Sequence, residues 1–125
     1  MKERTQPVFG APFPGPAMAD LHRGQVTPDQ LGTRLVGVAG LYRGHTFALV
    51  GETVTIGRDP HCMVALCNDP TVSRAHARVV LEDAGHVLHD ECSANGSFVN
   101  GVLVRACVLA PGDVVQCGTT RLRYE

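Results

Sequence analysis

From Arg34 onward, hydrophobic and polar positions form short runs of the kind that β-strands favour, separated by turn residues about every 6–12 positions. In residues 53–56 the pattern alternates, so that Val54 and Ile56 would lie on one face of an extended chain. No segment carries an extended helical period. The pattern therefore predicts an all-β fold, with short strands packed as a two-sheet β-sandwich.

Ten segments have this strand pattern: residues 34–39, 45–50, 53–56, 63–66, 77–82, 86–90, 97–99, 102–104, 113–116 and 120–124. Several of the connections between them carry turn chemistry. Asn100-Gly101 is the strongest two-residue hairpin signal in the chain, and Asp83-Ala84-Gly85 offers a glycine for a positive φ. Pro111-Gly112-Asp113 marks a further turn.

Residues 1–32 differ in composition from the rest of the chain. Proline and glycine dominate up to Pro16, and the remainder of the segment is polar with no sustained period. Proline removes backbone donors and glycine raises the entropy cost of ordering, so we expect a flexible arm at residues 1–32 and one domain at residues 33–125. Four prolines interrupt the apolar stretch at residues 7–16, so a signal peptide and secretion are not expected.

The overall composition limits the classes of partner. The 125 residues are 44% hydrophobic and 18% charged, which is typical of one soluble domain, and the net charge is -1. A general nucleic-acid or membrane-surface binder would carry a basic excess, so neither kind of partner is expected. No apolar run approaches the ~18 residues of a membrane-spanning helix. Any anion site must therefore be local, built from a few placed donors.

The cysteines indicate neither a disulfide framework nor a metal centre. Their number, five, is odd and no Cys-x-x-Cys occurs, which favours buried or half-buried thiols in a reducing cytoplasm. The one metal set that can be drawn matches no standard ligand spacing, so no metal and no cofactor are expected. Its members would be Cys62, Cys67, His89 and Cys92.

Three polar clusters offer groups that bind an oxyanion. Arg58 follows a predicted strand and Ser73-Arg74 precedes one, so all three residues lie at strand ends, where loops gather. Guanidinium forks and a hydroxyl supply the charge-assisted hydrogen bonds that a phosphate group accepts. The third cluster contains Asn95 and Asn100, each followed by glycine as in ordinary turns. A carboxamide can also pair with a peptide main chain, and we assign that role to Asn95 and a structural role to Asn100.

His76, close to Ser73 in the sequence, leaves two interpretations open. It is either a catalytic base, which would suggest a hydrolase, or a structural histidine whose ring nitrogens hold the loop. No Gly-x-Ser-x-Gly elbow surrounds Ser73, and no acid is evidently placed to orient His76. The structural role is favoured, and no enzyme is expected.

Taken in order, the motifs resemble the signature of one family, the forkhead-associated (FHA) domain, over residues 34–124. They are Gly57-Arg58, Ser73-Arg74-x-His76, Ser93-x-Asn95-Gly96-Ser97, Asn100-Gly101, Leu109-x-x-Gly112-Asp113 and Gly118. The resemblance implies a sandwich of about eleven strands of the FHA/SMAD-like type, with its binding loops at one end. It also implies that the ligand is a phosphothreonine peptide.

The resemblance further implies roles for individual residues. Arg58 and Ser73 would be the direct phosphate ligands, Arg74 an additional cationic contact, and Asn95 the residue that holds the peptide backbone. The residues that would shape the loops are Gly57, His76 and Asn100.

Two positions depart from the family pattern, and one of them, Ser97 in place of the commoner threonine, is conservative. Ala94 stands where many members of the family have a threonine whose hydroxyl adds to the phosphothreonine contact. The loss of one such hydrogen bond would weaken binding by on the order of 1 kcal/mol without abolishing it.

Two functions of different classes follow. The first is a phosphothreonine-binding adaptor in the cytoplasm, whose partner is a phosphorylated protein such as a Ser/Thr kinase or its substrate. The second is an assembly protein that keeps the fold but uses another surface, independently of phosphate. Ala94 favours the second, whereas the presence of all four candidate ligands together favours the first.

A further hypothesis concerns Thr5 and Thr27 in the expected arm. If a kinase modified Thr27, its phosphothreonine would compete for the site of the same or a neighbouring molecule, because tethering raises the effective concentration. An unmodified linker is the favoured interpretation. Calorimetric titration of one phosphopeptide into unmodified and Thr27-phosphorylated protein tests the hypothesis. Competition would weaken binding to the phosphorylated form, and equal affinities would exclude it.

Overall fold

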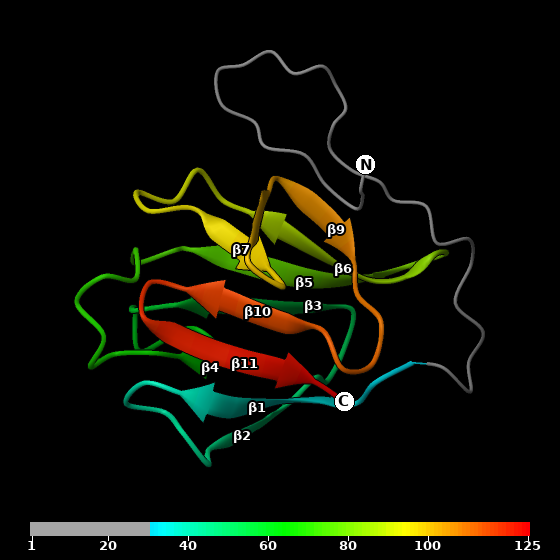
Figure 1. The fold of residues 1–125 in the computed structure, drawn as a ribbon. Helices are drawn as coiled ribbons and strands as arrows, with labels where there is room; N and C mark the ends of the chain where they lie inside the picture. The colour runs from blue at the N-terminus through cyan, green and yellow to red at the C-terminus, as the bar shows by residue number, and fades with distance from the viewer. Residues whose placement is uncertain (1–30) are drawn as a thin grey trace.

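The computed structural model describes residues 31–125, which form two β-sheets packed face to face (Figure 1). The all-β sandwich predicted from the sequence is confirmed, with eleven strands. Residues 1–30, including Thr5 and Thr27, lie outside the described residues, so the arm and its boundary stay predictions. Within residues 31–125, no helix is long and apolar enough to cross a membrane.

The larger sheet has six strands in the order β2-β1-β11-β10-β7-β8, and every neighbouring pair whose register is defined runs antiparallel. In that order, the strands are Thr46–Ala48, Arg34–Ala39, Thr120–Tyr124, Val114–Cys117, Ser97–Val99 and Val102–Val104. The smaller sheet has five strands in the order β4-β3-β5-β6-β9, in which only the β3–β4 pair is parallel. Their bounds are Val64–Ala65, Thr53–Gly57, Ala77–Glu82, Gly85–Asp90 and Ala106–Val108.

All ten strands predicted from the pattern occur, and β9 is the one that the pattern missed. Strand β9 follows β8 after Arg105 alone, and no turn residue separates the two strands. The chain nevertheless changes sheets there, since β8 pairs with β7 and β9 pairs with β6 of the other sheet. A change of partner without a turn residue leaves no signal in a hydrophobic pattern.

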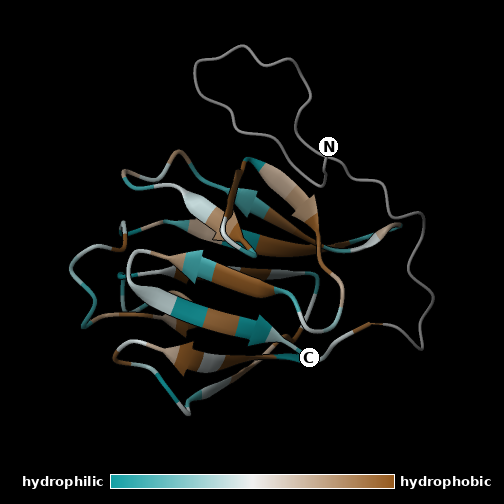
Figure 2. Cartoon of the chain, in the orientation of Figure 1, coloured by the Kyte–Doolittle hydropathy of each residue, from teal (hydrophilic) through white to brown (hydrophobic). Residues whose placement is uncertain are grey.

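The core lies between the two sheets and is built by side-chain alternation. In β11, Leu122 and Tyr124 are fully buried, whereas Arg121 and Arg123 are exposed on the outer face. Figure 2 shows this alternation as brown and teal bands along the central strands of the larger sheet. The same alternation occurs in β3, where Val54 and Ile56 are buried and point inward. Burial of these apolar side chains is the main stabilising contribution to the fold.

Five connections meet at one end of the sandwich, on the left in Figure 1: β1–β2, β3–β4, β4–β5, β6–β7 and β10–β11. Strand β1 begins and strand β11 ends at the opposite end. The two sheets thus act as a scaffold that presents loops from both sheets at a single end, where the candidate site residues lie.

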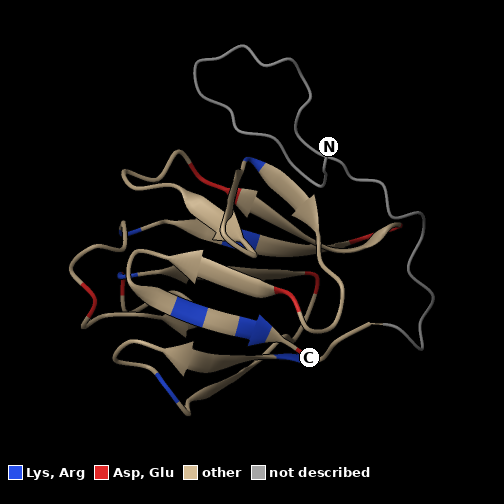
Figure 3. Ribbon diagram, in the orientation of Figure 1, with Lys and Arg blue, Asp and Glu red and all other residues tan. Residues whose placement is uncertain are grey.

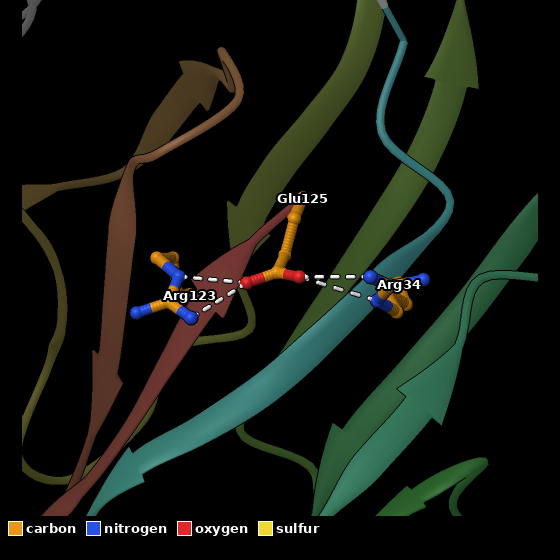
Figure 4. A network of polar contacts seen from close by, with 3 residues as sticks. All are labelled: Arg34, Arg123 and Glu125. Carbon is orange, nitrogen blue, oxygen red and sulfur yellow. Dashed lines mark hydrogen bonds and ion pairs between the residues drawn. The ribbon is translucent and has the colours of Figure 1, made fainter.

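The opposite end is closed by contacts between the first and last strands. The main-chain nitrogens of Thr33 and Arg34 donate to the carbonyl of Glu125 over 2.7 and 3.0 Å. The Glu125 carboxylate lies between Arg123 and Arg34 (Figure 4), and hydrogen bonds from these two arginines lower its pKa. In addition, the Gly32 amide donates to the Tyr124 hydroxyl over 2.7 Å. The beginning of the described chain is therefore attached far from the loops.

Candidate functional site

Arg58, immediately after β3, is held by the loop that contains Ser73. Its backbone amide donates to the Ser73 carbonyl over 3.0 Å, and its side-chain Nε donates to the Val72 carbonyl over 2.9 Å. The side chain is half-buried, and its Nη groups make no hydrogen bond within residues 31–125. Because guanidinium has five N–H donors, the Nη donors of a positioned fork are left for a ligand.

Ser73 connects two loops through its hydroxyl. The Ser73 Oγ accepts a hydrogen bond from the Ala94 amide of the β6–β7 loop, over 2.9 Å. A serine hydroxyl carries one donor as well as its acceptor lone pairs, so the O–H remains available to donate to an anion. The backbone of Ser73 is fixed on both sides, by Arg58 and by His76.

His76 is fully buried and makes a hydrogen bond with each ring nitrogen. Its Nδ1 accepts from the Ser73 amide at 3.0 Å, which leaves Nε2 to donate to the Gly96 carbonyl at 2.9 Å. The ring thus joins the β4–β5 loop to the β6–β7 loop. Its acceptor nitrogen is occupied by a main-chain amide and no longer available as a base for Ser73.

Gly57 allows the main chain of Arg74 to approach β3 closely. A Cβ atom at Gly57 would lie only 2.0 Å from the Arg74 carbonyl oxygen, a distance that no side chain can occupy. The same carbonyl accepts from the Asp59 amide over 3.3 Å. The Arg74 side chain is exposed at this end of the molecule. Figure 3 shows that the loops at this end carry both positive and negative residues. Any excess of positive charge is therefore confined to a few side chains.

Asn95 is exposed at the tip of the β6–β7 loop, and its Nδ2 donates to the Thr71 carbonyl over 2.8 Å. This bond uses one of the two amide hydrogens. The carbonyl oxygen and the second hydrogen remain as an acceptor and a donor, which is the pair that an extended peptide main chain requires.

Asn100 is the one candidate that the structure does not bring to this cluster. It lies at the turn after β7, whereas the loop that carries Asn95 precedes β7. With φ at 51°, it adopts the left-handed conformation of a hairpin turn and exchanges hydrogen bonds with Asp113 and Val114. It therefore shapes the β7–β8 turn rather than the loops of the candidate site, contrary to the expectation from the resemblance.

Sequence reasoning missed Asp69, a carboxylate that is 1% exposed and organises the β4–β5 loop. It accepts from the amide and hydroxyl of Thr71, from the amide and hydroxyl of Thr119, and from the hydroxyl of Thr120. Burial raises the pKa of this carboxyl, but the hydrogen bonds from the three threonines outweigh burial and lower it to about 2. The only sequence signal was the Asp-x-Thr spacing of a local turn.

Asp90 plays a similar part beneath the β6–β7 loop. Its Oδ1 accepts from the hydroxyls of Ser93 and Ser97 over 2.5 and 2.6 Å, and its Oδ2 accepts from the Ser93 amide over 3.1 Å. The two serines of the third motif therefore bind the protein itself and hold Asn95 in place. Within the described part of the chain, no group of three or more His, Cys, Asp or Glu residues is arranged to hold a metal ion.

The fold and the site define a β-sandwich whose loops present, at one end, hydrogen-bond donors positioned for an anion. Residues 54–118 match the FHA domain family, and the chain belongs to that family. Solved FHA structures share the fold. One comes from a study of phosphothreonine-dependent FHA domain interactions, with 30% identity, a TM-score of 0.66 and coverage of 74% of this chain and 93% of that one. The FhaA FHA domain complexed with the intracellular domain of Rv3910 has the same identity and TM-score and is covered over 99% of its length.

Curated relatives include the glycogen accumulation regulator GarA of Mycolicibacterium smegmatis, which is 42% identical over 90 residues. The oxoglutarate dehydrogenase inhibitor of Corynebacterium glutamicum is 38% identical over 90 residues. Both matches cover 72% of this chain but only 56% and 62% of the relatives, so the match spans little more than half of their length. Both proteins are named for regulation rather than for catalysis.

The depressed pKa of Asp69 predicts a specific loss of stability in acid. Its pKa is about 2 in the folded protein and 3.8 ordinarily, so its contribution is complete above about pH 4 and is lost as the pH falls towards 2. The contribution of Asp69 to the free energy of unfolding that is lost in acid is about 2 kcal/mol. In urea unfolding between pH 7 and pH 2, Asp69→Asn should be less stable at pH 7 and should lose less stability in acid than the wild type.

Glu52→Gln provides the control, since Glu52 is an exposed carboxylate next to β3 at the other end of the sandwich. Its stability should follow the wild type at every pH. An unchanged acid response in Asp69→Asn would contradict the assignment.

Proposed function

We propose that this protein is a phosphothreonine-peptide-binding adaptor in Ser/Thr-kinase signalling. The observation that carries the proposal is the arrangement of Arg58 and Ser73. Each is fixed by hydrogen bonds from neighbouring loops, and each has donors left over at the same end of the sandwich. Donors that are positioned before binding lose little conformational entropy when the ligand arrives.

The charge of the ligand follows from this set of donors. A phosphothreonine carries about -1.5 to -2 charges near pH 7 and three acceptor oxygens. The Nη groups of Arg58 and the hydroxyl of Ser73 supply short hydrogen bonds, and the exposed Arg74 adds a positive charge. Asn95 pairs with the peptide main chain beside the phosphate, which restricts the site to an extended peptide. Gly57 and His76 act by holding the backbone of these loops.

The family and the relatives support the same function. One matched structure comes from a study of phosphothreonine-dependent FHA domain interactions, and two curated relatives are named as a regulator and an inhibitor. We therefore propose that the partner is a phosphothreonine-containing protein, either a Ser/Thr kinase or its substrate, and not a nucleic acid or a membrane. All five cysteines lie in the described residues and none forms a disulfide, which fits a cytoplasmic location.

Arg58→Ala tests the proposal directly. In calorimetric titration with a degenerate phosphothreonine peptide library, the wild type should bind, whereas the unphosphorylated library should not. Arg58→Ala should weaken binding by at least about tenfold, because a charge-assisted pair is lost. A phosphoserine library run in parallel measures the preference for threonine.

The matched control is Arg34→Ala, which removes an exposed arginine at the opposite end of the sandwich and should bind like the wild type. Thermal unfolding of both variants verifies that they are folded. If no phosphopeptide binds the wild type, the phosphate-independent assembly protein becomes the better description.

A second prediction uses the departure from the family pattern at Ala94. This residue is exposed beside the phosphate donors, and its amide already donates to Ser73. Ala94→Thr adds one hydroxyl at that point and should tighten phosphothreonine binding by about fivefold, the equivalent of one modest hydrogen bond. Ala94→Val, which has the same shape without the hydroxyl, should give no gain. Equal affinities for the Thr and Val variants would show that the hydroxyl makes no contact.

A further inference from the structure

The β1–β2 turn, residues 40–44, lies against the loops of the site, and the proposed function does not use it. Two contacts attach it there. The Tyr42 hydroxyl accepts from the Asn68 amide of the β4–β5 loop over 2.9 Å. On its other side, a Cβ at Gly40 would lie 2.8 Å from the carbonyl oxygen of Thr119 in the β10–β11 turn. The turn is therefore part of the same end of the sandwich.

The turn is also internally ordered. Gly44 donates to the Gly37 carbonyl and His45 to the Tyr42 carbonyl, both over 2.9 Å. The rings of Tyr42 and His45 pack edge to face with centroids 5.2 Å apart, and Phe47 lies next to both. A ligand that contacts this turn would not have to order it first.

A continuous row of contacts leads from the candidate site to the turn. Asn95 donates to the Thr71 carbonyl, and the Thr71 hydroxyl accepts from the Thr119 amide over 3.0 Å. Thr119 in turn lies against Gly40. With about 5 Å between neighbouring segments, these three steps span about 15 Å, the length of roughly five residues of an extended peptide.

At the end of this row, the turn exposes one large apolar and one cationic side chain. Leu41 is 65% exposed, more than any other large hydrophobic residue in the described part of the chain. Arg43 is exposed, and none of the ion pairs within residues 31–125 includes it. A single exposed leucine is ordinary by itself. Here it stands beside a cation, on an ordered turn that continues the surface of an anion site.

We propose that the β1–β2 turn is a second contact for the same phosphothreonine peptide and selects its sequence. An apolar residue about five positions from the phosphothreonine packs on Leu41, and an acidic residue next to it pairs with Arg43. The inference rests on the proposed function. It goes further in naming the partner as an extended segment with an apolar and an acidic residue at that distance.

The test is a selection from peptides that carry seven random residues on each side of one phosphothreonine. Immobilised wild type should enrich an apolar residue about five positions from the phosphothreonine, on one side only, with an acidic residue beside it. Leu41→Ala should lose the apolar enrichment, and Arg43→Glu should exchange the acidic preference for a basic one. A single peptide from the wild-type selection should bind Leu41→Ala about tenfold more weakly in fluorescence anisotropy.

Leu81→Ala is the matched control, because Leu81 is also an exposed leucine but lies near the far end of β5. It should select the same peptides as the wild type. Retention of phosphothreonine peptides with identical profiles for the wild type, Leu41→Ala and Arg43→Glu would overturn this inference and leave the proposed function intact. No retention of phosphothreonine peptides by the wild type would overturn both.

Discussion

The carboxylate of Asp69 holds the β4–β5 loop against the β10–β11 turn, and the geometry of the candidate site follows from that attachment. Five donors from three threonines converge on one buried group. Thr71, fixed in this way, presents its carbonyl to Asn95, and the same loop continues to Ser73. A buried charge is costly unless it is fully hydrogen-bonded, so the loop has little freedom to adopt another conformation.

The candidate ligand residues also hold the loops of the protein itself. Arg58 uses Nε to hold the Val72 carbonyl, Ser73 uses its oxygen to hold the Ala94 amide, and Asn95 uses one amide hydrogen to hold Thr71. In each case, the atoms that bind the protein differ from those left for a ligand. These hydrogen bonds hold the donors in place although the site is built almost entirely from loops.

Much of this arrangement could be predicted from the sequence, because alternating hydrophobic and polar residues indicate strands, and Asn-Gly and related pairs indicate turns. The resemblance to the FHA signature also implied that the binding loops would lie together at one end. Strand β9 was missed because the chain changes sheets at Arg105 without a turn residue. Asp69 was missed because folding brings Thr119 and Thr120 to it from 50 and 51 positions along the chain. Asp90 was missed although its partners, Ser93 and Ser97, are near in sequence, because they were interpreted as part of the binding motif. Asn100 was assigned to the wrong loops because a three-residue strand separates it from them.

Gly32 lies against Glu125, the length of β11 away from the loops. From Glu125 back to Gly118, which packs on Thr71, an extended strand covers about 20 Å. Thr27 stands five positions before Gly32, and a chain of that length reaches at most ~18 Å even when fully extended. A phosphate extends beyond the main chain by the length of the threonine side chain, so a phosphate on Thr27 would reach its own loops only if the connecting residues were fully extended. A group attached close to Gly32 encounters the candidate site of a second molecule more readily, so its occupancy would depend on protein concentration. Thr5 is separated from Gly32 by a longer stretch of chain, so this limit on reach does not apply to it.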